Sequence, residues 1–241
     1  TDQSGLSTQP GLILMGGGAE PDAAFQWWLP KIAGGDVVVL RVSGEDGYND
    51  YLYEDIGGID SIQTLKVDSR SLAEDPYVAW QIEHAEGVFI AGGAQWDSLS
   101  LWSGTPLEDA LNGLLLRGAV LGGTSAGLAI LGDWAFSAGN GTVYSEEALA
   151  DPFNSYMTFE DDFLNLTWLN GHITDSHFSE RERMGRLLGF LCRMWVANVQ
   201  NPIGIGVDES TALLIDSSGT QVVGSGSVYV IEPTSAPEYC Q

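Results

Sequence analysis

Short apolar runs alternate with longer amphipathic stretches through the first half of the chain. Apolar runs of this length, bounded by glycine, predict β-strands, and their nearly continuous apolar character predicts a parallel sheet covered by helices on both faces. The strands expected in this half are Gly11–Met15, Val37–Val42, Thr64–Val67, Gly87–Ile90 and Ala119–Gly122. The helices expected between them are Asp22–Ile32, Pro76–Glu86 and Pro106–Arg117. Strands and helices in alternation indicate an α/β fold.

The pattern changes after Ser125. We expect a helix over Ala126–Leu131 and a loop over the polar, glycine-containing segment Gly139–Asp162, which is long enough to form an active-site lid. Further on we expect a strand His172–His177, a helix Glu180–Val199, and strands Ile203–Val207, Ala212–Asp216, Gln221–Val223 and Val228–Ile231. Turn residues separate the last three strands, which predicts an antiparallel extension of the sheet. With no linker or repeat in the pattern, we expect one domain over residues 11–241 after a flexible segment 1–10.

Charge narrows the possible partners. The chain has 9 Lys and Arg residues against 33 Asp and Glu residues, a formal net charge of −24. Such a field repels nucleic acids and anionic membranes, so neither is an expected partner. No apolar run approaches the roughly 20 residues that span a bilayer. Adaptation to a salty or extracellular medium is the favoured explanation of the charge, and attraction of cationic ligands is the alternative.

The two cysteines, Cys192 and Cys240, leave two possibilities open. They could form one disulfide that ties the C-terminus to a helix, or remain a buried thiol and a separate terminal one. The polar first ten residues have the character of the start of a processed mature chain. A secreted or periplasmic protein is therefore the favoured expectation, with a cytoplasmic one as the alternative. The sequence leaves the oligomeric state open, and a homodimer is one possibility.

A candidate nucleophile stands in the sequence GGTSAG at residues 122–127, directly after an apolar run. Its G-x-S-x-G spacing is typical of a strained strand-to-helix turn that exposes a serine Oγ, here that of Ser125. The serine would lie at a helix N-terminus, where the N–H of Ala126 favours an oxyanion. A glycine-rich turn with an incidental serine is the competing interpretation.

A serine nucleophile needs a base, and the chain has three histidines. His84 lies in a helix ahead of a strand, at the wrong end of a parallel sheet for this chemistry. His172 begins an expected strand and should face the opposite rim. His177 ends that strand and should emerge at the edge where Ser125 lies, which makes it the candidate base.

Three of the nine basic residues follow at once: Arg181, Arg183 and Arg186. Guanidinium groups beside a hydrolytic centre can hold a substrate carboxylate with two hydrogen bonds. The alternative is a solvated helix face on which Glu180 and Glu182 pair with arginines. Helical spacing places Arg183 and Arg186 on one face and Arg181 on another.

Other strand ends offer supporting groups. Asp208 and Glu209 follow an expected strand, and one of them could orient an imidazole; an acidic turn is the alternative. The sequence GGAQ at residues 92–95 offers backbone N–H groups for an oxyanion and the amide of Gln95 for binding. The sequence GGGAE at residues 16–20 lacks G-x-G-x-x-G spacing, so no dinucleotide site is expected. No cluster of metal ligands stands out either, and we expect no metal or other cofactor.

Several motifs together, from Gly11 to Ile231, resemble the cyanophycinase family of serine peptidases, relatives of the aspartyl dipeptidases. They are GGGAEPD, IAGGAQ, GTPLEDAL, GGTSAG, DSHFSERERMGRLL, GIGVDESTAL and VVGSGSVYVIE. The resemblance implies a flavodoxin-like α/β fold, a three-layer sandwich akin to class I glutamine amidotransferase domains, with a mostly parallel sheet and C-terminal antiparallel strands. Two positions depart from the usual motifs: Ala94 replaces an acidic residue, and Ser176 precedes the histidine.

The resemblance also implies roles for particular residues. Ser125 would be the nucleophile, His177 the general base and Glu209 its acidic partner. From the local sequence we expect the N–H groups of Gly93 and Ala126 to hold the oxyanion. The residues expected to contact substrate are Gln95, Asp175, Ser176, Arg181, Arg183 and Arg186.

The implied reaction is hydrolysis of cyanophycin, a poly-aspartate with arginine on each side chain, through an acyl-enzyme that yields β-Asp-Arg dipeptides. The arginines suit an aspartyl carboxylate, and the acidic surface suits guanidinium groups. An aspartyl dipeptidase is the alternative enzyme. A non-catalytic binding protein on the same scaffold is the alternative from another class.

Overall fold

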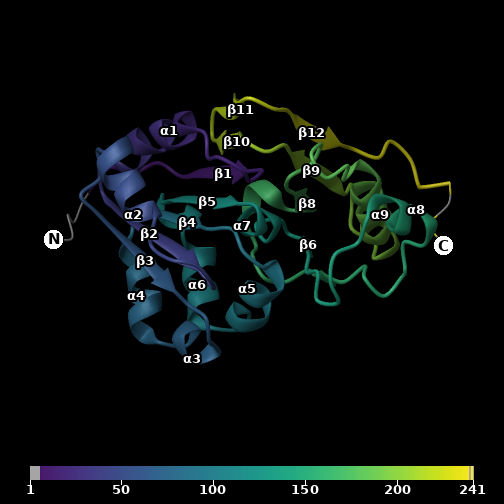
Figure 1. Ribbon diagram of the computed structural model, residues 1–241, viewed down its shortest axis with the longest axis horizontal. Coiled ribbons are helices and arrows are strands. Elements are labelled where there is room, and N and C mark those ends of the chain that lie inside the picture. The colour runs from purple at the N-terminus through teal and green to yellow at the C-terminus, as the bar shows by residue number, and fades with distance from the viewer. Residues whose placement is uncertain (1–5, 239, 241) are drawn as a thin grey trace.

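The structure, a computed structural model, describes residues 6–238 and 240. Its main sheet has seven strands in the order β11-β10-β1-β5-β4-β2-β3 (Figure 1). Five of them pair in parallel: β1 (Gly11–Met15), β2 (Asp36–Arg41), β3 (Ser61–Lys66), β4 (Gly87–Ile90) and β5 (Val120–Thr124). The hairpin of β10 (Thr211–Asp216) and β11 (Gly219–Gly224) continues the sheet antiparallel to β1.

Helices cover both faces of this sheet, because the apolar side chains of each strand alternate between them. In β1, Leu12 and Leu14 join one apolar cluster, and Ile13 and Met15 join the other. The first cluster lies under α3 (Arg70–Ala73), α4 (Pro76–His84), α5 (Gln95–Trp102), α6 (Pro106–Gly113) and α7 (Ala126–Ala129). The second lies under α1 (Asp22–Ile32), α2 (Tyr48–Asp50) and the π-helical turn Tyr51–Ile56. Fully buried strands of this kind explain the continuous apolar runs in the sequence.

A second sheet of three strands, ordered β12-β9-β8, lies beside the first (Figure 1). Strand β8 (His172–Asp175) runs parallel to β9 (Ile203–Val207), and β12 (Val228–Ile231) runs antiparallel to β9. Helices α8 (Ser145–Ala150) and α9 (Met184–Val196) pack with it around a third apolar cluster that includes Ile173 and Phe190. The short strands β6 (Ala135–Phe136) and β7 (Phe159–Glu160) pair with each other.

Three expectations of the sequence need correction. Strand Val228–Ile231 joins the second sheet rather than the hairpin extension of the first. The segment 139–162, expected to be a loop, contains α8 and β7, because Ala148 is fully buried and the Glu147 carboxylate accepts from the N–H of Tyr144 at the start of α8. The helix expected over Glu180–Val199 begins only at Met184.

Other boundaries moved by a few residues or were not foreseen. The helix expected from Ala126 ends at Ala129, and α6 ends at Gly113 before a separate 3₁₀ turn. Helix α5 and the helical segments between residues 48 and 56 had no counterpart in the predicted elements. In the first ten residues, the N–H of Gln9 donates to the Lys31 carbonyl at 2.9 Å, while residues 1–5 lie outside the described chain.

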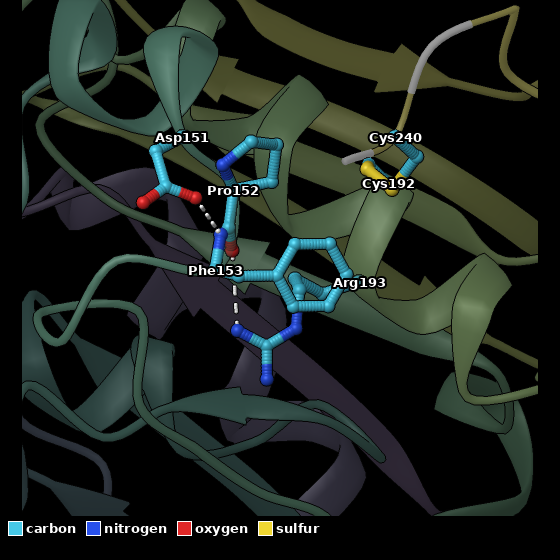
Figure 2. The surroundings of a disulfide bond; sticks show 6 residues. All are labelled: Asp151, Pro152, Phe153, Cys192, Arg193 and Cys240. Carbon is cyan, nitrogen blue, oxygen red and sulfur yellow. Dashed lines mark hydrogen bonds between the residues drawn. A yellow bond between two sulfur atoms is a disulfide. The ribbon is translucent and has the colours of Figure 1, made fainter.

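The two cysteines form a disulfide, with 5.8 Å between the Cα atoms of Cys192 and Cys240 (Figure 2). It fastens the segment after β12 to α9. A cavity of about 510 Å³ lies between this segment, α8 and α9, and none of the candidate catalytic residues lines it. The sequence left this pairing open.

Candidate active site

Three side chains from three strand ends meet in one chain of hydrogen bonds. Ser125 directly follows β5, His177 follows β8, and Glu209 follows β9. Ser125 Oγ lies 2.8 Å from His177 Nε2, and His177 Nδ1 lies 2.5 Å from Glu209 Oε1. The imidazole side chain is only 10% exposed, whereas the Glu209 side chain is 36% exposed. This is the geometry of a nucleophile, a base and an acidic group that orients the base.

The backbone is strained at two of these residues. Ser125 has φ +54° and ψ −115°, and His177 has φ +45°, values that few residues other than glycine adopt. The strain at Ser125 ends β5 sharply and directs the side chain out of the sheet, as the G-x-S-x-G spacing predicts. Strain of this kind persists only where surrounding contacts fix it.

Those contacts come from consecutive carbonyl groups at the end of β1. The Met15 carbonyl accepts from the N–H of Ser125 at 3.1 Å, and the Gly16 carbonyl accepts from the N–H of His177 at 2.7 Å. The Gly17 carbonyl accepts from the N–H of Ser210, next to Glu209, at 2.8 Å. A single short segment therefore aligns all three loops that carry the candidate catalytic residues.

Gly17 also faces the imidazole directly. A Cβ atom at this position would lie 2.4 Å from His177 Cε1, and the residue has φ +97°. Both facts require glycine. From the sequence, residues 16–20 are excluded as a dinucleotide site and belong to one motif of the family resemblance, but no contact with His177 is predicted for them. Three glycines at a strand end that borders the Ser125 strand were the available signal.

The two acidic residues after β9 divide their tasks. Glu209 contacts His177, as expected. Asp208 is 6% exposed, and its carboxylate accepts from the N–H groups of Ser179 and Ser227, both at 2.9 Å. Asp208 therefore fixes the loops on either side of β9 and does not face the imidazole.

The structure corrects the expectation that Asp175, Ser176 and Arg186 contact substrate. The three residues are only 2–3% exposed. Arg186 donates through Nε to Asp175 Oδ2 at 2.7 Å and through Nη2 to Asp175 Oδ1 at 2.5 Å. The guanidinium and the carboxylate thus satisfy each other inside the protein, because a buried charge needs a bonded partner.

Arg183 and Arg181 differ in their surroundings. The Arg183 side chain is 12% exposed and donates to the Ser176 carbonyl at 2.7 Å. Its burial lowers its pKa to about 10, with Asp175 opposing this effect. Arg181 is exposed, and in the part of the chain that the structure describes its guanidinium has no hydrogen-bond acceptor. Of the three arginines, Arg181 alone remains open to a ligand.

The pKa of His177 lies below its usual value. Burial is the largest cause, and the positive charges of Arg181 and Arg183 act in the same direction. The hydrogen bond and the negative charge of Glu209 oppose them. A lowered pKa keeps the imidazole neutral at neutral pH, the state in which it can accept a proton.

The remaining expected residues lie in the segments that follow β4 and β5. Gln95 is the first residue of α5, and its amide donates to the Phe136 carbonyl at 3.0 Å. Gly93 is exposed, and its neighbour Gly92 approaches Ser125: a Cβ atom there would lie 3.3 Å from Ser125 Cβ. Ala126 begins α7 and is 6% exposed. The oxyanion roles of Gly93 and Ala126 stay predictions.

The other two histidines lie elsewhere, as expected. His84 stacks on Trp80 with 4.2 Å between ring centroids, and His172 Nδ1 lies 2.8 Å from the Asn170 carbonyl. Among residues 6–238 and 240, no group of three or more His, Cys, Asp or Glu side chains could hold a metal ion. No helix within the same residues is long and apolar enough to cross a membrane.

A comparison with protein families decides the classification. The family described as Peptidase family S51 matches residues 48–223 of this chain. The chain belongs to peptidase family S51. It is therefore a serine peptidase, and Ser125 lies within the matched region.

Curated relatives match this chain over most of its length. A cyanophycinase from Synechococcus elongatus is 29% identical over 239 residues, 94% of this chain and 70% of that protein. A cyanophycinase from Trichormus variabilis is 30% identical over 185 residues, 76% of this chain and 57% of that protein. Both similarities agree with the assignment of this chain to peptidase family S51.

Solved structures support the fold. A peptidase from an acI-B1 Actinobacterium superposes with a TM-score of 0.65 at 17% identity, covering 93% of this chain and 91% of that one. A putative peptidase E from Listeria monocytogenes superposes with a TM-score of 0.55 at 13% identity, covering 91% and 100%. The flavodoxin-like sandwich expected from the sequence is confirmed, and the S51 chain shares it with these peptidases.

Proposed function

We propose that this S51 peptidase is a serine-type exopeptidase that hydrolyses cyanophycin and releases β-Asp-Arg dipeptides through an acyl-enzyme. The chain of hydrogen bonds from Ser125 through His177 to Glu209 carries the proposal for the chemistry. The similarity to curated cyanophycinases over 94% of the chain supports the substrate.

In the proposed mechanism Glu209 accepts a hydrogen bond from His177 Nδ1, which leaves Nε2 free to accept the Ser125 proton. Ser125 Oγ attacks the peptide carbonyl carbon, and the N–H groups of Gly93 and Ala126 stabilise the oxyanion. His177 then gives its proton to the leaving amine, and the peptide C–N bond breaks. Water, deprotonated by His177, hydrolyses the resulting ester and restores the serine.

Arg181 is the proposed contact for a substrate carboxylate. Its side chain is exposed and acts electrostatically on His177. Its backbone N–H donates to the His177 carbonyl at 3.1 Å, which places Arg181 beside the base. Each of the other six arginines donates to an acceptor within the described chain. A free guanidinium beside the base is suited to fix an aspartyl or terminal carboxylate.

The disulfide supports a location in an oxidising compartment, because such bonds persist mainly in exported proteins. We therefore retain secretion or periplasmic export as part of the proposal. Fractionation of the producing cells, with thiol labelling before and after reduction, would test it. A reduced protein confined to the cytosol would contradict it.

The test of function compares three substrates: cyanophycin, α-Asp dipeptides and β-Asp-Arg. We expect release of β-Asp-Arg from cyanophycin, and Ser125→Ala should lower this rate by about 10⁴-fold or more while the protein stays folded. Hydrolysis of α-Asp dipeptides alone would indicate an aspartyl dipeptidase. Binding of cyanophycin without release of dipeptide would indicate a binding protein. Near-normal turnover by Ser125→Ala would contradict the mechanism.

A further inference from the structure

Arg186 is bound on all sides by the protein. Its guanidinium holds both carboxylate oxygens of Asp175, and its Nη1 lies 3.4 Å from Thr142 Oγ1 and from the Val143 carbonyl. The guanidinium also lies over the ring of Phe136, 5.2 Å from its centroid. Such complete enclosure is costly for a charge unless every donor is used, and it leaves no face for a ligand.

The contact between Arg186 and Asp175 connects Arg186 to His177, the candidate base. Asp175 is the last residue of β8, two residues before His177. Its carboxylate also accepts from the N–H of Ser176 at 2.9 Å, and Arg183 Nη1 donates to the Ser176 carbonyl. The strained turn at His177 therefore begins from a peptide fixed on both its N–H and its C=O side.

The other contacts of Arg186 are with the segment before α8. Besides Thr142 and Val143, the backbone N–H of Arg186 donates to Ser145 Oγ at 3.1 Å, and Ser145 Oγ donates to the Glu182 carbonyl. Phe136, under the guanidinium, is the residue whose carbonyl accepts a hydrogen bond from the amide of Gln95, the first residue of α5. Arg186 thus lies between the base turn and the segment 136–145.

We propose that Arg186 is a positioning residue: through Asp175 it fixes the turn that holds His177 against Ser125, and it ties segment 142–145 to that turn. Substitution of Arg186 should change the rate at which Ser125 reacts as a nucleophile and not the binding of substrate. A misplacement of a reacting group by about 1 Å can cost roughly 100-fold in rate. The inference rests on the proposed serine chemistry and not on the identity of the peptide.

The experiment measures how fast a fluorophosphonate labels Ser125. In this reaction Ser125 Oγ forms a bond to phosphorus, fluoride leaves, and His177 accepts the serine proton, so the rate reports on the Ser125–His177 pair without any peptide. The variants are Arg186→Lys, which keeps the charge but loses the two-oxygen contact, and Asp175→Asn/Arg186→Gln, which removes both charges of that pair. In the double variant Arg183 loses its 3.3 Å contact with Asp175 but keeps its hydrogen bond to the Ser176 carbonyl.

Arg193 provides the matched control. It lies on the same helix, donates to the Pro152 carbonyl and lies 4.7 Å from the centroid of the Phe153 ring (Figure 2). It also donates to the Met157 carbonyl. Arg186 ties α9 to the segment before α8, whereas Arg193 ties it to the segment after α8, and none of the Arg193 contacts leads to His177. Arg193→Lys should therefore label at the wild-type rate, within about twofold, and calorimetry of all variants should report folding.

We expect labelling of both Arg186 variants to slow by about 100-fold. Their KM for peptide should change less than about threefold, because the Arg186 guanidinium is buried and bonded to protein groups. Wild-type labelling by Arg186→Lys, a raised KM with unchanged labelling, or unfolding of both variants while Arg193→Lys folds would each overturn the proposal. Failure of the wild-type protein itself to be labelled would instead contradict the proposed function.

Discussion

At the scale of single residues, the site is made by backbone as much as by side chains. Ser125 and His177 both occupy left-handed conformations, and the carbonyls of Met15 and Gly16 hold them there. Gly17 completes the arrangement, because only a residue without Cβ leaves room for the imidazole. The candidate catalytic groups are thus aligned by atoms that every residue has, in a conformation that few residues permit.

Gly17→Ala tests this alignment. The added methyl group would overlap His177 Cε1, and alanine is strained at φ +97°. We expect about a 100-fold loss of kcat/KM and a destabilisation of about 1 kcal/mol or more, measured by peptide hydrolysis and urea unfolding. Gly47→Ala is the control: no atom lies within 4 Å of its Cβ position, and its φ of −56° suits any residue. Equal effects of the two substitutions would refute the argument.

Arg181→Gln tests the electrostatics of the base. Activity requires neutral His177, so kcat/KM rises with pH as the imidazole loses its proton. Arg181 lowers the pKa of His177, although less than burial does. Removing this charge should raise that pKa and move the acidic limb of the pH profile to higher pH. A shift to lower pH would contradict the assignment, and high salt should reduce the shift.

At the scale of elements, the site depends on the turn between β8 and α9. The sequence predicts a helix from Glu180, but positive φ values at His177 and Glu182 delay the helix until Met184. This delay separates the arginines: Arg186 lies in the first turn of α9 and faces inward, whereas Arg181 lies in the turn and stays exposed. One short sequence therefore supplies both an internal support and a free cation.

Removal of the disulfide tests how much the link between α9 and the end of the chain stabilises the protein. Cys192 and Cys240 are 48 residues apart, and a crosslink over such a loop stabilises by up to about 4 kcal/mol. Cys192→Ser/Cys240→Ser should lower the free energy of unfolding by a similar amount in urea titrations. The same loss should follow reduction of the wild-type protein, and the double variant should not respond to reductant. A wild-type protein whose stability is independent of reductant would contradict the crosslink.

At the scale of the whole molecule, the net negative charge is the feature that most affects how stability depends on salt. A net charge of −24 on 241 residues creates strong self-repulsion in the folded state, and salt screens it. The distance over which charges interact falls from about 30 Å at 0.01 M salt to about 8 Å at 0.15 M. The favoured explanation of this charge, life in a salty or extracellular medium, is therefore open to test.

We expect the unfolding midpoint to rise by several degrees when NaCl increases from 0.01 to 0.5 M, because screening relieves the repulsion. Calorimetry at fixed pH measures it. Sodium sulfate, which also strengthens apolar burial, distinguishes the two effects, since it should stabilise further at equal ionic strength. A midpoint that falls with NaCl would show that attractive ion pairs outweigh the repulsion.

Much of the fold could be predicted from the sequence because apolar periodicity reports burial directly. Strands such as Gly11–Met15 and Gly87–Ile90 were predicted at their observed bounds, since both their faces are covered. Helices such as α5, and α8 in the segment taken for a loop, were not predicted because their short sequences lack a clear period. Their stability comes from packing against elements distant in the chain.

For the site, the sequence by itself determined the chemical groups: a serine on a constrained turn, one histidine at the right strand end, and an acidic partner. Only the tertiary structure decided that Glu209 and not Asp208 contacts the imidazole, that Gly17 faces it, and that Arg186 is buried. The physical reason is that burial and hydrogen bonding of a polar side chain depend on what other segments bring to it, and local pattern carries no record of those segments.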